Sequence, residues 1–190
     1  MIEFTSYKDT YYSLYRKLCD PLYIDGSQVS YDQLQEIEER GFLMGQAISR
    51  EEALKAPFFE IALENGPVGL IRGDLLSSTF NEEHTFEWFL KATPEIKQAF
   101  DEIKILELGV IVVTEEMKGK GLAKKLLSHL ESYARGIGRK HLFSWVPEKP
   151  ENKPSKLFHL KNGFQIVALY SSNIAYGFKD YQCNLLHKKI

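Results

Sequence analysis

The stretch EEMKGKGLAKKLL, Glu115 to Leu127, places two glycines around one lysine and then continues as a lysine-rich helical pattern. It follows KILELGVIVV, Lys104 to Val113, a segment nearly all apolar near its end, as expected for a strand covered on both faces. A strand, a glycine turn and a helix in succession point several free backbone N–H groups at one spot, where the helix dipole adds positive charge. The stretch therefore predicts a site that binds an anion.

Two nucleotide-binding loops share this design, and neither matches. A Walker A loop requires Gly-Lys-Ser/Thr, but Gly119-Lys120 is followed by Gly121, so the hydroxyl that binds magnesium is missing. The dinucleotide fingerprint G-x-G-x-x-G/A would have its third small residue at Lys124, a side chain too large for close helix–strand contact. A Walker A loop is excluded, and a nucleotide-binding oxidoreductase is a distant alternative.

A third class agrees with the pattern. The segment VTEEMKGKGLAKKLL resembles motif A of the GNAT superfamily of N-acetyltransferases, Arg/Gln-x-x-Gly-x-Gly/Ala after a strand that ends in valine. The motif falls on Lys118 to Ala123, and Lys118 keeps the positive charge of the family's arginine without its planar fork. Downstream, NKPSKLFHLKNGF resembles motif B, with Asn152 and Ser155 at the family's intervals. The resemblance covers Lys104 to about Tyr170 and implies that the anion is the pyrophosphate of acetyl-coenzyme A or a related acyl-coenzyme A.

The resemblance also implies how the cofactor is held. The backbone of Ile111, Val112 and Val113 would pair with the pantetheine arm like an extra strand, because the central sheet splays after this strand. Gly119, Gly121 and Ala123 would cradle the pyrophosphate, while Lys120 also suits a solvent-exposed face. The full set expected at the cofactor is Ile111, Val112, Val113, Lys118, Gly119, Lys120, Gly121, Leu122, Ala123, Lys124, Asn152 and Ser155.

Two residues are candidates for catalysis. Glu107 is the only carboxylate inside the central strand, and its apolar neighbours should raise its pKa, as a base for an ammonium substrate requires. Pairing across the sheet is the structural alternative for Glu107. His159 stands where many family members have a tyrosine that protonates the departing thiolate. It could serve as that acid, hydrogen-bond coenzyme A, or simply belong to its helix.

The order of patterns predicts one α/β (α+β) domain over residues 1–190, with a mixed, mostly antiparallel central sheet flanked by helices and an insertion at about 74–104. Ser30 and Gly41 bound an expected helix, and Asn65-Gly66 is a hairpin signal. The remaining expected elements are a helical stripe from Tyr7 to Leu18, a helix from about Leu122 to Arg135, the strand KHLFSWV, the short helix PSKLFHLKNGF, and the closing strands QIVALY and YQCNLLHKK.

Composition limits the partners. The net charge of −2 argues against nucleic acid and anionic membranes, and the N-terminus lacks the pattern of a signal peptide, so we expect a cytoplasmic protein. Cys19 and Cys183 are expected as reduced thiols, and the five histidines have no metal-ligand spacing, so no metal is expected.

The acceptor site would be built from Tyr7 to Arg40 and the insertion, which could also be a lid or the contact of a homodimer. The insertion holds aromatic residues beside acidic ones, which suit a cationic amine but more often form core; they are His84, Phe86, Glu87, Trp88 and Phe89. The expected activity is acetyl-coenzyme A-dependent N-acetylation of a small-molecule or peptide amine by direct attack in a ternary complex. A catalytically silent acyl-coenzyme A-binding module, or transfer of a longer acyl group, remains an alternative.

Overall fold

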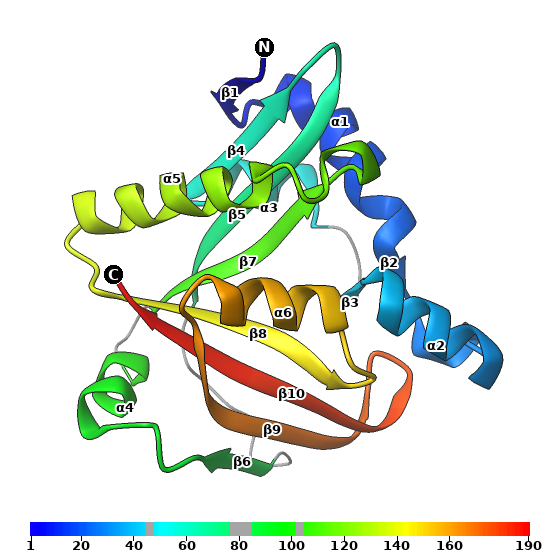
Figure 1. Ribbon diagram of the computed structural model, residues 1–190, viewed down its shortest axis with the longest axis vertical. Helices are drawn as coiled ribbons and strands as arrows, with labels where there is room; N and C mark the ends of the chain where they lie inside the picture. Colours follow the sequence, from blue (N-terminus) through cyan, green and yellow to red (C-terminus); the bar gives the residue numbers. More distant parts are fainter. Residues whose placement is uncertain (45–47, 77–84, 102–104) are drawn as a thin grey trace.

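The computed structural model describes residues 1–44, 48–76, 85–101 and 105–190. Its main feature is an eight-stranded sheet with the strand order β1-β4-β5-β7-β8-β10-β9-β6, and β2 and β3 form a separate parallel pair (Figure 1). The strands are β1 (Glu3–Ser6), β2 (Tyr23–Ile24), β3 (Leu43–Met44), β4 (Phe58–Leu63), β5 (Pro67–Leu76), β6 (Thr85–Trp88), β7 (Ile105–Val113), β8 (His141–Lys149), β9 (Gln165–Ala175) and β10 (Phe178–Lys189).

The two central strands, β7 and β8, are the only parallel neighbours in the large sheet as the described residues form it. Strand β7 leads through helix α5 (Leu122–Gly136) to β8, and this pair is in register only at Glu107 and Phe143. All other neighbours in the large sheet are antiparallel. The mixed, mostly antiparallel sheet expected from the sequence is therefore confirmed, including its βαβ unit.

Helices cover both faces of the sheet. Figure 1 shows α5 and α6 on the near face, and α5 buries Leu126 and Leu130 against Ile71 and Leu106 in one apolar cluster. The opposite face of β4, β5 and β7 packs against α1, which contributes Tyr15. The helices are α1 (Tyr12–Cys19), α2 (Tyr31–Arg40), α3 (Arg50–Lys55), α4 (Pro94–Phe100), α5 and α6 (Lys153–Lys161), and the 3-10 turns are η1 (Asp9–Tyr11), η2 (Asp20–Leu22), η3 (Gly26–Gln28) and η4 (Glu115–Met117).

Local signals predicted several boundaries correctly. Ser30 caps α2 in a reciprocal capping box with Gln33, and Gly41 follows its last residue. Asn65 adopts a positive φ of 57° in the turn between β4 and β5. The sequence patterns did not reveal β1, β2, β3, β6 or α3.

The segment expected as an insertion contributes to the core. Thr93 caps α4, which begins at Pro94, and β6 pairs with β9 at the far edge of the sheet. Phe86 and Trp88 pack with Phe100 in the apolar cluster under α4, which agrees with the core interpretation. His84 lies outside the described residues.

Other sequence expectations concern cysteines, metal binding and membrane spans. Cys19 and Cys183 are both free, as expected, and both are buried. Among the described residues, no three His, Cys, Asp or Glu side chains gather in a way that could hold a metal ion. No helix in the described ranges has the length and apolar character needed to cross a membrane.

Candidate active site

A large cleft opens where β7 and β8 separate. Beyond Glu107 and Phe143 the two strands diverge, and Ser144 Oγ still donates a hydrogen bond to the carbonyl oxygen of Leu108 at 3.0 Å. The edge of β7 from Gly109 to Val113 then lines a cleft of about 1290 Å³, which reaches from the glycine turn before α5 to the hairpin between β9 and β10. This volume exceeds the range of about 300–1,000 Å³ typical of small-molecule sites.

The glycine turn is shaped for close approach of a ligand. Gly119 and Gly121 have φ angles of 74° and 79°, and a Cβ atom at either position would meet no atom within 4 Å. The first backbone bond of α5 runs from Lys125 N to the Gly121 carbonyl oxygen at 3.1 Å, and no side chain caps the helix. The N–H groups of the first turn are therefore available to an anion, as the sequence predicts.

The lysines of the turn differ in position. Lys118 lines the cleft, and its Nζ lies 2.6 Å from Oε1 of Glu115, so an anion would compete with this carboxylate. Lys124 also lines the cleft, whereas Lys120 lies outside its lining. All the other residues expected at the cofactor line this one cleft.

Asn152 and Ser155 stand at the beginning of α6. The Asn152 side chain is buried, its oxygen accepts from Ser155 N at 3.2 Å, and its Nδ2 donates to the Phe42 carbonyl oxygen at 2.7 Å. The Asn152 amide thus caps α6 with its oxygen and ties the helix to the segment after α2 with its nitrogen. Contact of Asn152 and Ser155 with the cofactor stays a prediction.

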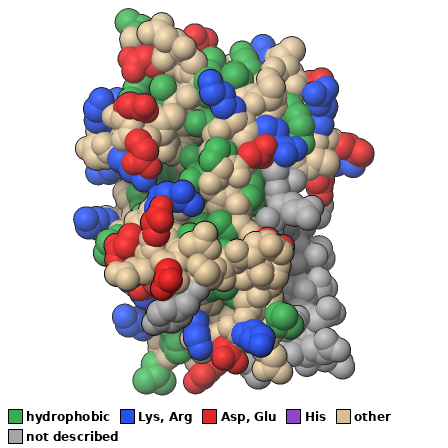
Figure 2. Space-filling view, turned by 90° about the vertical axis from the view of Figure 1, so that its right-hand side faces the viewer, with side chains coloured by type: hydrophobic (Ala, Val, Ile, Leu, Met, Phe, Trp, Pro, Cys, Tyr) green, Lys and Arg blue, Asp and Glu red, His purple; other side chains and the backbone are tan. Residues whose placement is uncertain are grey.

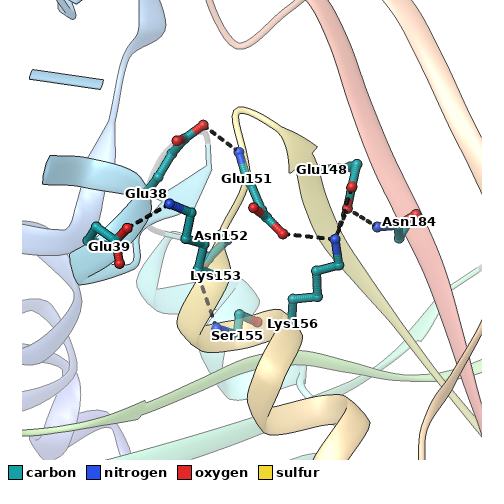
Figure 3. Close-up of polar contacts among 9 residues, drawn as sticks. All are labelled: Glu38, Glu39, Glu148, Glu151, Asn152, Lys153, Ser155, Lys156 and Asn184. Atoms are coloured by element: carbon teal, nitrogen blue, oxygen red, sulfur yellow. Dashed lines mark hydrogen bonds and ion pairs between the residues drawn. The ribbon is translucent and has the colours of Figure 1, made fainter. Parts of the chain in front are cut away.

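Charged pairs strengthen the same junction (Figure 3). Lys153 pairs with Glu39 at 2.6 Å, and the Glu151 backbone N–H donates to Glu38 at 2.9 Å. Lys156 contacts both Glu148 and Glu151, at 2.7 and 2.8 Å. The contacts of Glu38 and Glu39 join α2 to the start of α6, whereas Lys156 joins α6 to the end of β8 and the turn after it.

Glu107 is the buried acid of the cleft. Burial, reinforced by the nearby charge of Asp74, raises its pKa to about 8, and the Arg72 charge opposes this rise. Its Oε2 is buried and has no hydrogen-bond partner among the described residues. The raised pKa expected from the sequence is confirmed, and a carboxyl with this pKa can hold or release a proton near neutral pH.

His159 lies in the cleft as a buried, neutral imidazole. Its Nδ1 is 2.7 Å from the Ser155 carbonyl oxygen, which can only accept, so Nδ1 carries the proton. Burial lowers the pKa of the ring to about 4. Nε2 is then an unprotonated acceptor, buried and without a partner in the described structure, and the arrangement favours accepting a hydrogen bond over donating a proton.

The wall opposite the glycine turn contains a charged pair that the sequence analysis missed. Arg72 on β5 lines the cleft, and its Nε lies 2.8 Å from Oδ2 of Asp74, which stands opposite Glu107 in the sheet. The stretch VGLIRGDLL carries the only signal, two opposite charges two residues apart in an apolar strand, where side chains share a face.

The hairpin between β9 and β10 closes the cleft on the remaining side. Ile174 and Tyr176 line it, and the Tyr176 carbonyl oxygen accepts from Gly26 N at 2.9 Å. Gly177 packs so closely on η3 that a Cβ atom would collide with the Ser27 backbone. The hairpin tip is therefore held against the segment before α2.

An open glycine turn at the N-terminus of α5 lies beside the edge of β7 from which β8 diverges. Comparison with known proteins identifies the family to which this arrangement belongs. The sequence profile of the acetyltransferase (GNAT) family matches residues 12–164, so the chain belongs to this family. No curated protein sequence matches the chain significantly.

Solved structures show the same fold at low sequence identity. An N-acetyltransferase from Staphylococcus aureus Mu50 has a TM-score of 0.62 at 14% identity, with 100% of this chain and 97% of that chain covered. The paia N-acetyltransferase from Thermoplasma acidophilum, in complex with coenzyme A, has a TM-score of 0.58 at 14% identity, covering 100% and 99%. Arabidopsis thaliana Naa50, in complex with the bisubstrate analogue CoA-Ac-MVNAL, has a TM-score of 0.61 at 16% identity, covering 100% and 99%.

Proposed function

We propose that the chain transfers an acetyl group from acetyl-coenzyme A to a primary amine of a small molecule or peptide, by direct attack within a ternary complex. One observation carries the proposal. Glu107, a buried carboxyl with a free oxygen and a raised pKa, lies in the same cleft as the open glycine turn of α5. A base for an ammonium substrate and a cradle for a pyrophosphate therefore face one space.

The residues present fit acetyl-coenzyme A. Its pyrophosphate would lie on the backbone of Gly119, Gly121 and Ala123, where a helix dipole and free N–H groups meet open space. Lys118 and Lys124 would offset its charge, and the pantetheine arm would follow the edge of β7 over 111–113. The bound group supplies an acetyl unit activated as a thioester.

The chain's own residues would then handle the proton and the developing charge. The Glu107 carboxylate would accept the proton that the acceptor ammonium must lose before its nitrogen can attack. Backbone N–H groups on the free edge of β7 would stabilise the charge on the acetyl oxygen. In balance, an N–C bond forms, the C–S bond breaks, and a thiol and an amide result.

The departing sulfur does not require an acid at His159. A thiol has a pKa of about 8.5, so a thiolate is a tolerable leaving group near neutral pH and can take its proton from water. With a pKa of about 4 and its proton on Nδ1, the buried His159 ring would act instead as a hydrogen-bond acceptor for the cofactor.

The surface supports a small acceptor. On the face shown in Figure 2, acidic and basic side chains are interspersed, without the single-sign patch that a nucleic acid would require. Tyr176, at the clamped hairpin tip, lines the same cleft as Arg72 and Glu107.

Thermal unfolding with acetyl-coenzyme A, ATP and NAD in parallel tests the cofactor, because a ligand at 100 times its dissociation constant stabilises by about 2.7 kcal/mol. Thiol release with a panel of amines then tests transfer. Stabilisation by acetyl-coenzyme A alone, followed by amine-dependent thiol release, is the expected result. Stabilisation without release for any amine would indicate a silent binding module, and no stabilisation would contradict the proposal.

A further inference from the structure

Arg72 is a buried cation whose donors are only partly used. Its side chain is 12% exposed, its Nε donates to Asp74 at 2.8 Å, and its Nη1 is buried without a hydrogen-bond partner among the described residues. Leaving a charged donor buried and unpaired is costly, more so than for a neutral group. Because Arg72 lines the cleft, a ligand that enters there can complete its hydrogen bonding.

The sheet places this cation beside Glu107. Arg72 and Asp74 share one face of β5, and Asp74 stands directly opposite Glu107 on β7. Gly109 makes room for the pair, because a Cβ atom there would collide with the Asp74 carboxylate and lie 3.3 Å from Arg72 Nη2. The register shift of β5 against β7 falls at the same place, between Arg72 and Gly73.

Arg72 Nη1, a positively charged hydrogen-bond donor, and Glu107 Oε2, an oxygen that can accept a proton, both lack a partner among the described residues. Glu107 stands opposite Asp74, which lies two residues from Arg72, or about 7 Å along the strand. An α-amino acid holds its amine and carboxylate about 3 Å apart, and one hydrogen bond of about 2.8 Å at each end gives a bent path of about 8 to 9 Å. A path of this length can span such a separation.

We propose that the acceptor is an apolar α-amino acid, whose carboxylate binds Arg72 while its amine faces Glu107. The charges then alternate along the wall, from Asp74 to Arg72, to the acceptor's carboxylate, to its ammonium and to Glu107. Apolar side chains that also line the cleft would receive the acceptor's side chain, and they are Leu22, Met44 and Ile48. This inference rests on the proposed function and names its substrate class.

Transfer would proceed with the acceptor held at both ends. Glu107 takes one proton from the ammonium, the amine nitrogen forms a bond to the acetyl carbon, and the C–S bond breaks. The nitrogen releases its second proton to water and the thiolate takes one from water, which gives coenzyme A thiol and an N-acetylamino acid. The carboxylate on Arg72 takes no part in bond making. Arg72 is therefore a specificity-determining residue.

The test compares matched acceptors with the unmodified protein. L-leucine, L-methionine and L-phenylalanine are each assayed beside their amides and decarboxylated amines, and kcat/KM from thiol release is corrected for the unprotonated amine fraction. We expect each acid to exceed its amide by about 10- to 100-fold, as one charge-assisted hydrogen bond gives. Equal or faster transfer to the amides or amines would overturn the inference and leave the proposed function standing. Absence of thiol release with every amine would instead contradict the proposed function.

Variants of Arg72 test whether this residue causes the preference for acid over amide. Arg72→Gln should raise KM for the acids and abolish the preference for acid over amide, with KM for acetyl-coenzyme A unaffected, and Arg72→Lys should restore part of the preference. The double variant Arg72→Gln/Asp74→Asn avoids an unpaired buried carboxylate if the single variant folds poorly. Arg135→Gln, an exposed arginine of α5 outside the cleft lining, is the matched control. A preference that persists in folded Arg72→Gln would overturn the assignment.

Discussion

Nδ1 of His159 lies 2.7 Å from the carbonyl oxygen of Ser155, one turn earlier in α6. This contact fixes the proton on Nδ1, and burial lowers the pKa of the ring to about 4. The imidazole is therefore neutral throughout the physiological range, and its free atom in the cleft is an acceptor. Two consequences can be measured, one on the rate and one on stability.

His159→Asn should leave the shape of the pH–rate profile unchanged between about pH 6 and 9. Asparagine can still donate to the Ser155 carbonyl oxygen, so the start of α6 should keep its structure. Loss of the Nε2 acceptor should lower the affinity for acetyl-coenzyme A without shifting the pKa values of the pH–rate profile. Loss of the alkaline limb of the profile would contradict this and support acid catalysis by His159.

The same residue should contribute to acid sensitivity. The folded pKa of His159 is lowered from 6.5 to about 4, so its stabilising contribution is present above pH 6.5 and is lost as pH falls through 4. Urea unfolding at pH 7, 5.5 and 4 should show a smaller acid loss in His159→Asn than in the parent chain. Equal losses would contradict the assignment.

Glu107 should oppose stability at high pH. Its folded pKa is raised from 4.5 to about 8, so stability is greatest below pH 4.5 and falls as pH rises through 8, at about 1.36 kcal/mol per pKa unit as an upper bound. Glu107→Gln should therefore raise the unfolding temperature at pH 9 and change it little at pH 5, while lowering kcat about 10²- to 10⁴-fold.

The exposed Glu87→Gln, on the far edge strand, is the control for this pair of measurements. An unchanged kcat in Glu107→Gln would remove Glu107 from the reaction. An unchanged stability profile would mean that the carboxyl is solvated in the folded state.

Gly121→Glu should abolish the stabilisation by acetyl-coenzyme A, because a carboxylate would occupy the open space in front of the α5 N-terminus. Gly121→Ala separates the two effects of the change. Both variants share the strain of a left-handed backbone, about 1–2 kcal/mol, but only the glutamate repels an anion. Lys120→Ala, outside the cleft lining, should keep the full shift, and equal shifts in all three variants would contradict the cradle.

Lys156→Met should destabilise the junction of α6 with the end of β8 by about 1–2 kcal/mol, because Glu148 and Glu151 would lose their shared cation and repel each other. Urea unfolding measures the loss. Lys189→Met, which breaks a more exposed pair with Glu95, should change stability far less. Similar effects in the two variants would show that the network at α6 adds nothing.

Local sequence signals were sufficient to predict the part of the cleft that we propose binds the cofactor. The glycine turn, the uncapped helix and the apolar strand are contiguous, so their geometry follows from neighbouring residues. Glu107 was identifiable as the one carboxylate in that strand, and its burial follows from the strand's central place in the sheet. Asn152 was placed correctly at the start of α6, but its pattern with Ser155 is also that of a helix cap, which is how the structure uses it.

The part of the cleft that we propose binds the acceptor is formed by contacts between segments that are distant in the sequence. Arg72 approaches Glu107 only because β5 pairs with β7, with a register shift that no local pattern announces. Strand β6 was not recognised because its partner, β9, lies about eighty residues away and supplies the pairing that a four-residue strand needs.

The clamped hairpin between β9 and β10 has a consequence for how acceptor preference can change. The family profile ends at residue 164, whereas Ile174 and Tyr176, which line the acceptor end of the cleft, lie beyond it. Substitutions in the hairpin can therefore reshape that end while the glycine turn before α5 is left intact. Because a Cβ atom at Gly177 would collide with the Ser27 backbone, a substitution at the hairpin tip would need a matching change in η3. Under the proposed function, acceptor range would be shared by the two ends of the chain, and cofactor binding would belong to its middle.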